Sequence, residues 1–190
     1  MSIKYGLLAI LDESPAYGYQ LKTEFERRTA SAWPLNIGQV YTTLDRLSRD
    51  GLVTPLDPTD DTRTYAITPA GRAELKTWFT TPIEQTTPPR NDLAIKLALA
   101  ASTHADLTAI IQAQRTATMR TLQHYTLAKR QADASDTAWL MVVELMIFTA
   151  EAEIRWLDHC EGLASRPTPT RSDAPAAVTA PAQSKDKAVR

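Results

Sequence analysis

Apolar residues in the first 80 positions recur at helical spacing in four places and form strand-like runs in two. The third helical run is the clearest, because Val40, Leu44 and Leu47 share one face at spacings of four and three. Asn36 precedes this run as an N-cap, and Gly51 follows it as a left-handed C-terminal residue. The pattern predicts helices at residues 3–11, 17–28, 36–50 and 68–79, and a hairpin of strands at residues 52–56 and 63–67.

Beyond residue 91 the apolar spacing predicts helices that are nearly free of glycine. We expect a short helix at residues 92–99, a long one at residues 106–131, and a last one at residues 136–161 that ends at Gly162. A stripe with this 3.5-residue repeat is typical of a helix that packs against another helix, of its own chain or of a partner subunit. The stripe consists of Leu140, Val143, Ile147, Ala150, Ile154 and Leu157, and it is widened by Trp139, Val142, Met146 and Phe148.

These patterns divide the chain into four parts. Residues 1–80 are expected to form a compact, turn-rich domain, because five of the six glycines lie in the first 71 residues. Residues 81–91 contain three prolines and are expected to be a linker to a helical region at residues 92–163. Residues 164–190 are rich in proline and alanine and lack aromatic residues, so we expect them to be disordered.

Composition excludes several explanations of function. The whole chain has 21 Lys and Arg against 22 Asp and Glu, so its bulk charge indicates neither a nucleic acid nor a membrane as partner. No stretch reaches the roughly 18 apolar residues of a spanning helix. The lone Cys160 fits a reducing compartment. We therefore expect a cytoplasmic protein without a membrane partner.

No arrangement typical of a catalytic or metal site is present in the sequence. His104, His124 and His159 are scattered, and His159 and Cys160 are neighbours about 100° apart on a helix. A glycine-rich phosphate loop, a GxSxG turn and an HExxH motif are all missing. The expectation is therefore no enzymatic activity, no cofactor and no metal.

The order helix, helix, helix, hairpin, helix is that of a winged helix-turn-helix. Its local motifs are AYGYQL at residues 16–21, NIGQVYTTLDRL at 36–47, DGLV at 50–53 and RTYAITPAG at 63–71. Together these motifs resemble the PadR family of bacterial transcriptional regulators. The resemblance implies a DNA-binding winged helix-turn-helix at residues 1–80 and a C-terminal helical region that forms a homodimer. The expected fold is mainly α with a small β-hairpin wing, followed by an antiparallel helical dimerisation region, with the apolar stripe of the last helix as dimer interface.

The exposed face of the third helix carries side chains suited to reading DNA. Glutamine can pair with adenine, arginine with guanine or phosphate, and threonine with phosphate or a thymine methyl. Phenol hydroxyls near the helix starts can reach phosphates, and an arginine at the wing can reach phosphate or the minor groove. The expected DNA-binding residues are Tyr19, Asn36, Gln39, Tyr41, Thr42, Thr43, Arg46 and Arg63.

Structural alternatives stay open for several of these residues. Asn36 can serve only as an N-cap, and the face of the third helix can be an ordinary solvated one. Arg63 can pair with Asp60 or Asp61 in the wing loop. That loop is acidic, and residues 1–80 hold nine Lys and Arg against ten Asp and Glu, so we expect modest nonspecific DNA affinity.

The resemblance also implies a small-molecule effector, because some members of the family bind aromatic ligands between subunits. Trp139 is the candidate contact, with a role in the core or in the dimer interface as the alternative. The expected function is a homodimeric repressor that binds an inverted-repeat operator in double-stranded DNA and is released by a small aromatic effector. The alternative is a winged-helix protein interaction module without DNA binding, which the acidic wing loop favours.

Overall fold

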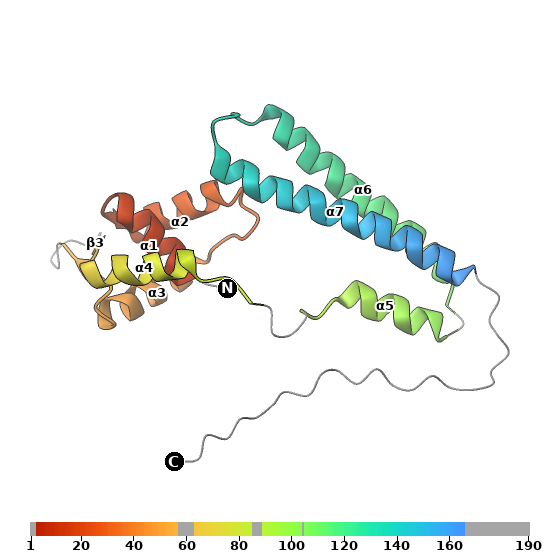
Figure 1. Cartoon of the computed structure of the whole chain (residues 1–190), viewed down its shortest axis with the longest axis horizontal. Helices are drawn as coiled ribbons and strands as arrows, with labels where there is room; N and C mark the ends of the chain where they lie inside the picture. Colours follow the sequence, from red (N-terminus) through yellow and green to blue (C-terminus); the bar gives the residue numbers. More distant parts are fainter. Residues whose placement is uncertain (1–2, 57–62, 85–88, 104, 166–190) are drawn as a thin grey trace, which may run out of the picture.

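The computed structural model describes residues 3–56, 63–84, 89–103 and 105–165. Figure 1 shows a cluster of short helices at one end and two long helices extending away from it. Mainly helical architecture with a small antiparallel sheet confirms the expected fold class. The elements are α1 (Ile3–Glu13), β1 (Ala16–Tyr17), α2 (Gly18–Arg28), α3 (Ile37–Arg49), β2 (Val53–Pro55), β3 (Thr64–Ile67), α4 (Pro69–Thr80), α5 (Asp92–Ala101), α6 (Leu107–Gln131) and α7 (Thr137–Ala164).

Helix α1 is at the centre of the N-terminal cluster, where it packs against α2, α3, α4 and β3. Its Leu7 and Leu8 are fully buried, as are Leu21 of α2 and Val40 and Leu44 of α3. Burying one leucine side chain contributes about 1.5–3 kcal/mol. The apolar face of α3 that the sequence predicts is therefore the face that attaches this helix to the domain, which leaves the opposite face outward.

Both ends of α3 are capped by the residues that the sequence indicates. The Asn36 side-chain oxygen accepts a hydrogen bond from the Gly38 N–H at 2.8 Å, and the Gln39 side-chain oxygen accepts one from the Asn36 N–H at 3.3 Å. This reciprocal pair satisfies N–H groups at the helix start. At the other end, Gly51 has a φ of +70°, which glycine adopts without steric cost.

The sheet has three strands, one more than the sequence indicates. β3 lies between β1 and β2 and pairs antiparallel with both, with Ala16 opposite Tyr65 and Val53 opposite Ile67. β1 is two residues long, so its apolar pattern is too short to be recognised in a sequence. The predicted hairpin is confirmed for its two strands, whereas the acidic loop with Asp57, Asp60 and Asp61 lies outside the described residues.

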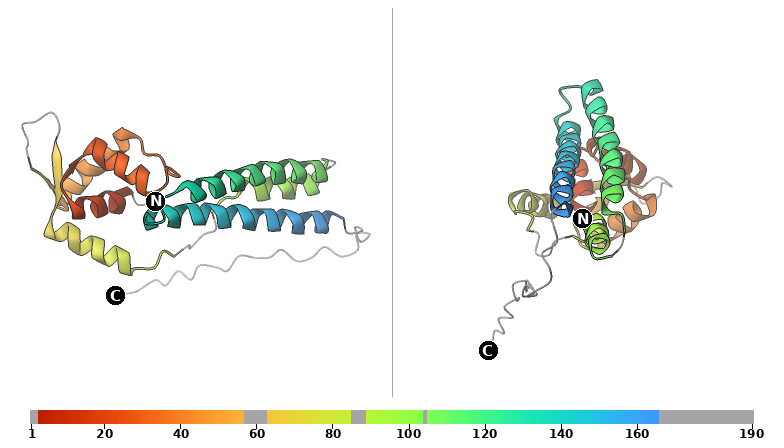
Figure 2. Two further views of the ribbon diagram at one scale, coloured as in Figure 1. Left: turned by 90° about the horizontal axis from the view of Figure 1, so that it is seen from above. Right: turned by 90° about the vertical axis from the view of Figure 1, so that its right-hand side faces the viewer.

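Helices α6 and α7 form an antiparallel pair and lie side by side in both figures, with α5 next to α6 (Figure 2). A small core joins the three helices through Leu97, Ile111 and Leu157. Polar contacts fix the register of the pair: Arg115 binds Asp158 at 2.6 Å and Glu161 at 2.7 Å, and Lys129 binds Glu144. The expected helical region at residues 92–163 therefore packs within a single chain.

The end of the last helix differs from the prediction. α7 continues through Gly162 to Ala164, and Ser165 is its C-cap. The reason is that Gly162 keeps a negative φ, unlike Gly51, so it does not turn the chain out of the helix. Within the described residues, no helix is long and apolar enough to cross a membrane.

Four residues of the predicted dimer stripe on α7 are already covered within the single chain, and the role of the stripe between subunits stays a prediction. Val143, Ile147, Ala150 and Leu157 are at most 8% exposed in the single chain, on the face of α7 that packs on α6. These four side chains are therefore contacts within the chain, because a side chain that is already covered has little surface left for a partner. Leu140 and Ile154 are half-buried, and a role for them between subunits stays a prediction.

Candidate nucleic-acid interface

The outward face of α3 presents an exposed row of polar side chains. Gln39, Thr42 and Arg46 are exposed, and Arg49 lies on the same side one turn further. Neither arginine has a carboxylate within ion-pair distance among the residues that the structure describes. A helix of this size fits the major groove of B-DNA, where such side chains can reach base edges.

The two threonines of α3 differ in their surroundings. The Thr42 hydroxyl donates to the Gly38 carbonyl at 2.8 Å, and the Thr43 hydroxyl donates to the Gln39 carbonyl at 2.7 Å. Each hydroxyl therefore offers an acceptor and its methyl group to DNA, rather than its proton. Thr42 is exposed, whereas Thr43 is half-buried at the edge of the face.

Asn36 is an N-cap in this structure, as one of its two readings predicts. The bond to Gly38 occupies its side-chain oxygen and leaves the amide NH2 group available as a donor. The structure thus favours the cap without testing a DNA contact. Arg63 is exposed just before β3, and its predicted pairing with Asp60 or Asp61 involves residues outside the described part of the chain.

This face also carries one acidic residue that is absent from the expected DNA-binding set. Asp45 is exposed on the outward side of α3, between Thr42 and Arg49 on the helix surface. A carboxylate there repels phosphates and can accept a hydrogen bond from the amino group of cytosine. The helical wheel of residues 37–49 already contains this signal, because Asp45 lies about 140° away from the buried Val40.

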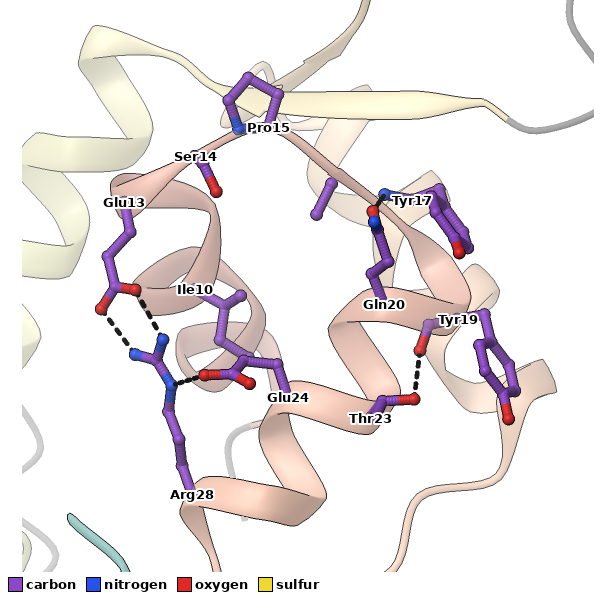
Figure 3. Close-up of a pocket in the computed structure, with 11 residues that line it drawn as sticks. Ile10, Glu13, Ser14, Pro15, Tyr17, Tyr19, Gln20, Thr23, Glu24 and Arg28 are labelled. Carbon is purple, nitrogen blue, oxygen red and sulfur yellow. Dashed lines mark hydrogen bonds and ion pairs between the residues drawn. The ribbon is translucent and has the colours of Figure 1, made fainter. Parts of the chain in front are cut away.

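The start of α2 brings tyrosines next to α3. Tyr19 is 60% exposed and Tyr41 is 43% exposed. Figure 3 shows Tyr17 and Tyr19 together at the first turn of α2, where the Gln20 side chain accepts a hydrogen bond from the Tyr17 N–H at 3.2 Å. Phenol groups at such a helix start can donate to phosphate oxygens.

A cluster of charged side chains and the tyrosines of α2 lie on opposite sides of one groove (Figure 3). The groove has a volume of about 520 Å³ and runs between the end of α1 and α2. Arg28 binds Glu13 through two bonds of 2.6 Å and Glu24 through another of 2.6 Å. Hydrogen bonds from Arg27 and Arg28 lower the pKa of Glu24 to about 2, against the opposing effect of burial, and the bond from Arg28 lowers the pKa of Glu13.

This charged cluster reaches the helical pair. Arg27 of α2 donates to Asp136 at 2.8 Å, and Asp136 is also the N-cap of α7, where it accepts from the Trp139 N–H at 3.2 Å. Trp139 is half-buried on the first turn of α7. It therefore lies close to the junction between the N-terminal domain and the helical pair, which the sequence could not indicate because the contact joins residues more than 100 positions apart.

The exposed face of α7 carries an apolar row, of which the sequence pattern includes Phe148 as a flank of the predicted stripe. Met141, Leu145 and Phe148 are 69%, 51% and 60% exposed at spacings of four and three. Three large apolar side chains on one helix face are more than an isolated exposed residue, and such patches mark interaction sites. We call these three residues the outer row of α7.

Three packed helices, an antiparallel hairpin and an outward third helix, whose arginines have no carboxylate partner among the described residues, define a winged helix-turn-helix of the DNA-binding class. Residues 7–77 match the model of the transcriptional regulator PadR-like family, and residues 89–164 match that of the virulence activator alpha C-terminal region. The N-terminal part of the chain, residues 7–77, is thus a PadR-like domain of the kind found in transcriptional regulators. The resemblance carried by the sequence motifs is thus confirmed.

Known proteins are similar to this chain over most of its length. A Mycobacterium tuberculosis protein named as a transcriptional regulator is 29% identical over 181 residues, which cover 84% of this chain and 95% of that protein. Bacillus subtilis PadR in complex with operator DNA superposes with a TM-score of 0.69 at 16% identity, over 87% of this chain and 100% of PadR. The same protein in complex with p-coumaric acid gives a TM-score of 0.72 at 17% identity, with the same coverage. The family and these relatives are regulators of transcription rather than enzymes.

Proposed function

We propose that this chain is a homodimeric, sequence-specific repressor that binds an inverted-repeat operator through α3. The observation that carries the proposal is the outward face of α3, where Gln39, Thr42 and Arg46 are exposed and the arginine has no carboxylate partner among the described residues. In a symmetric dimer, two such helices would enter successive major grooves roughly 34 Å apart. Bound there, the protein would compete with RNA polymerase for the promoter.

Selection of binding sites from random duplex DNA tests this proposal first. An inverted repeat should be enriched, and Gln39→Ala or Arg46→Ala should weaken its binding by about 1–3 kcal/mol each. Arg72→Ala is the matched control, because it removes the same charge from the exposed side of α4, where Arg72 pairs with Asp12 at 2.8 Å. A folded wild-type protein that enriches no site would instead support the interaction module without DNA binding.

The dimer is proposed to form through the outer row of α7. Each of these side chains leaves about half or more of its surface outside the single chain. Covering Met141, Leu145 and Phe148 in a second copy removes that apolar surface from water, which favours association. Helix α5 adds Ile95 and Leu99, which are exposed four residues apart on one of its faces.

The effector is proposed to be a small planar aromatic compound that contacts Trp139. Two observations support this: the half-buried indole lies on the turn whose cap, Asp136, binds Arg27 of the DNA-binding domain, and the related PadR of B. subtilis has a complex with p-coumaric acid. A ligand that binds one domain orientation better than the other would shift the dimer between them. Titration of planar aromatic acids against tryptophan fluorescence tests the contact, with Trp139→Phe as control. Absence of any saturable change would contradict it.

A further inference from the structure

The ring of Tyr41 occupies space on α2 that is available only because residue 18 is glycine. Gly18 is the first residue of α2, and Tyr41 lies near the start of α3. A Cβ atom at position 18 would lie 2.7 Å from Cε1 and 2.8 Å from Cζ of Tyr41. Carbon atoms in contact are about 3.5–4.0 Å apart. A side chain at position 18 and the Tyr41 ring therefore cannot both keep these places.

The two partners of this contact differ in their freedom to move. Gly18 is buried backbone held in the first turn of a helix, whereas the Tyr41 ring is 43% exposed at the end of a flexible side chain. Among the described glycines only Gly51 has a positive φ, so the backbone at position 18 accepts alanine without strain. An added methyl group would consequently displace the ring outward and leave the helices in place.

Displacement of the ring would also move the Tyr41 hydroxyl, which faces DNA in the proposed complex. The Tyr41 hydroxyl oxygen lies 3.2 Å from the same Cβ position, so it is next to the first turn of α2. The N–H groups of that turn have no carbonyl partner within the helix. The Tyr41 ring and the first turn of α2 thus form one surface, with the hydroxyl beside Gly18.

We infer that Gly18 is a positioning residue for DNA binding: by lacking a side chain it lets Tyr41 lie on α2 and fixes the direction of the Tyr41 hydroxyl. The inference rests on the proposed function, because the place of this hydroxyl matters for binding only if the face of α3 meets DNA. A purely structural role for Gly18 makes a different prediction, namely a loss of stability that does not depend on what stands at position 41.

A double-mutant cycle on the full-length protein tests the inference. The variants are Gly18→Ala, Tyr41→Ala, the two combined, and Tyr41→Phe, which keeps the ring but removes the hydroxyl. Affinity for the selected operator and thermal unfolding are measured for each. Gly162→Ala is the matched control for a glycine replacement in a helix, because a Cβ there meets nothing within 4 Å.

We expect Gly18→Ala to lower operator affinity at least tenfold while the unfolding temperature changes little. In the Tyr41→Ala background the same replacement should change affinity less than twofold, since no ring is left to displace. Tyr41→Phe should lose part of the affinity, and Gly162→Ala none. Additive losses in the double variant, unchanged affinity of Gly18→Ala, or unfolding of Gly18→Ala that Tyr41→Ala does not rescue would each overturn the inference.

The cycle also separates failure of the inference from failure of the proposed function. If the wild-type protein enriches no operator, the proposed function fails before any variant is compared. If the wild type binds an operator and the cycle is additive, the proposed function stands and the positioning role of Gly18 is wrong.

Discussion

Replacing Phe148 with aspartate should show which face of α7 forms the dimer interface. Phe148 is 60% exposed in the single chain. If a fully exposed phenylalanine has about 200 Å² of accessible surface, about 120 Å² of Phe148 remains accessible to solvent. At about 25 cal/mol per Å², covering this area contributes about 3 kcal/mol per subunit, and a symmetric interface uses it twice. These values are upper limits, so Phe148→Asp should raise the dimer dissociation constant about 10²- to 10⁴-fold.

Sedimentation over a concentration series measures the dissociation constant, and circular dichroism shows whether each variant is folded. Phe148→Asp should be a folded monomer with reduced operator affinity, and Phe148→Leu, which stays apolar, should remain a dimer. Ile147→Asp is the contrasting variant, because its side chain is 8% exposed and the charge would enter the α6–α7 contact. We expect it to lose helix content. A folded monomer from Ile147→Asp, together with an intact Phe148→Asp dimer, would refute this reasoning. The predicted stripe would then be the dimer interface.

Three further predictions concern stability. Gly162→Ala should raise the free energy of unfolding by about 0.5–1 kcal/mol, because glycine inside a helix is unfavourable, and an unchanged unfolding temperature would argue against helix at this position. Asn36→Ala should lower it by about 1 kcal/mol through loss of the cap, with Asn36→Ser restoring most of that, and equal stabilities would show that the cap is dispensable. Because the pKa of Glu24 falls from 4.5 to about 2 on folding, its contribution is complete above pH 4.5 and is lost as the pH falls toward 2. Acid titration should therefore show the stability gap between wild type and Glu24→Gln closing in this window, and a gap independent of pH would contradict it.

The N-terminal domain could be predicted from the sequence because its signals are local. The cap at Asn36, the left-handed Gly51 and the spacing of Val40, Leu44 and Leu47 each depend on residues within one helix. The same local patterns define which face of α3 is buried and, by exclusion, which faces outward. Strand β1 was missed because two residues carry no period, and only its pairing with β3 defines it.

The C-terminal region shows the limit of that reasoning. The α7 sequence correctly predicted a buried apolar stripe, but a stripe alone cannot say whether its partner is in the same chain or in another. The structure assigns Val143 and Ile147 to the face that packs on α6 and leaves the outer row exposed. The sequence also carries the signal for that row, since Met141, Leu145 and Phe148 repeat the spacing of the first stripe on the other side of the helix.

The cations of the N-terminal domain differ in whether they form ion pairs, and the net charge of the domain does not show this difference. Lys4, Lys22, Arg27, Arg28 and Arg72 all bind carboxylates on α1, α2, α4 or α7. Arg46 and Arg49 on α3 form no ion pair with the described residues, and these two cations outnumber the one carboxylate of the same face, Asp45. Phosphate attraction depends on the cations at the contact surface rather than on the sum over the domain. A domain with more acidic than basic residues can therefore still present a cationic helix to DNA, with its ion pairs on α1, α2 and α4 serving the fold instead.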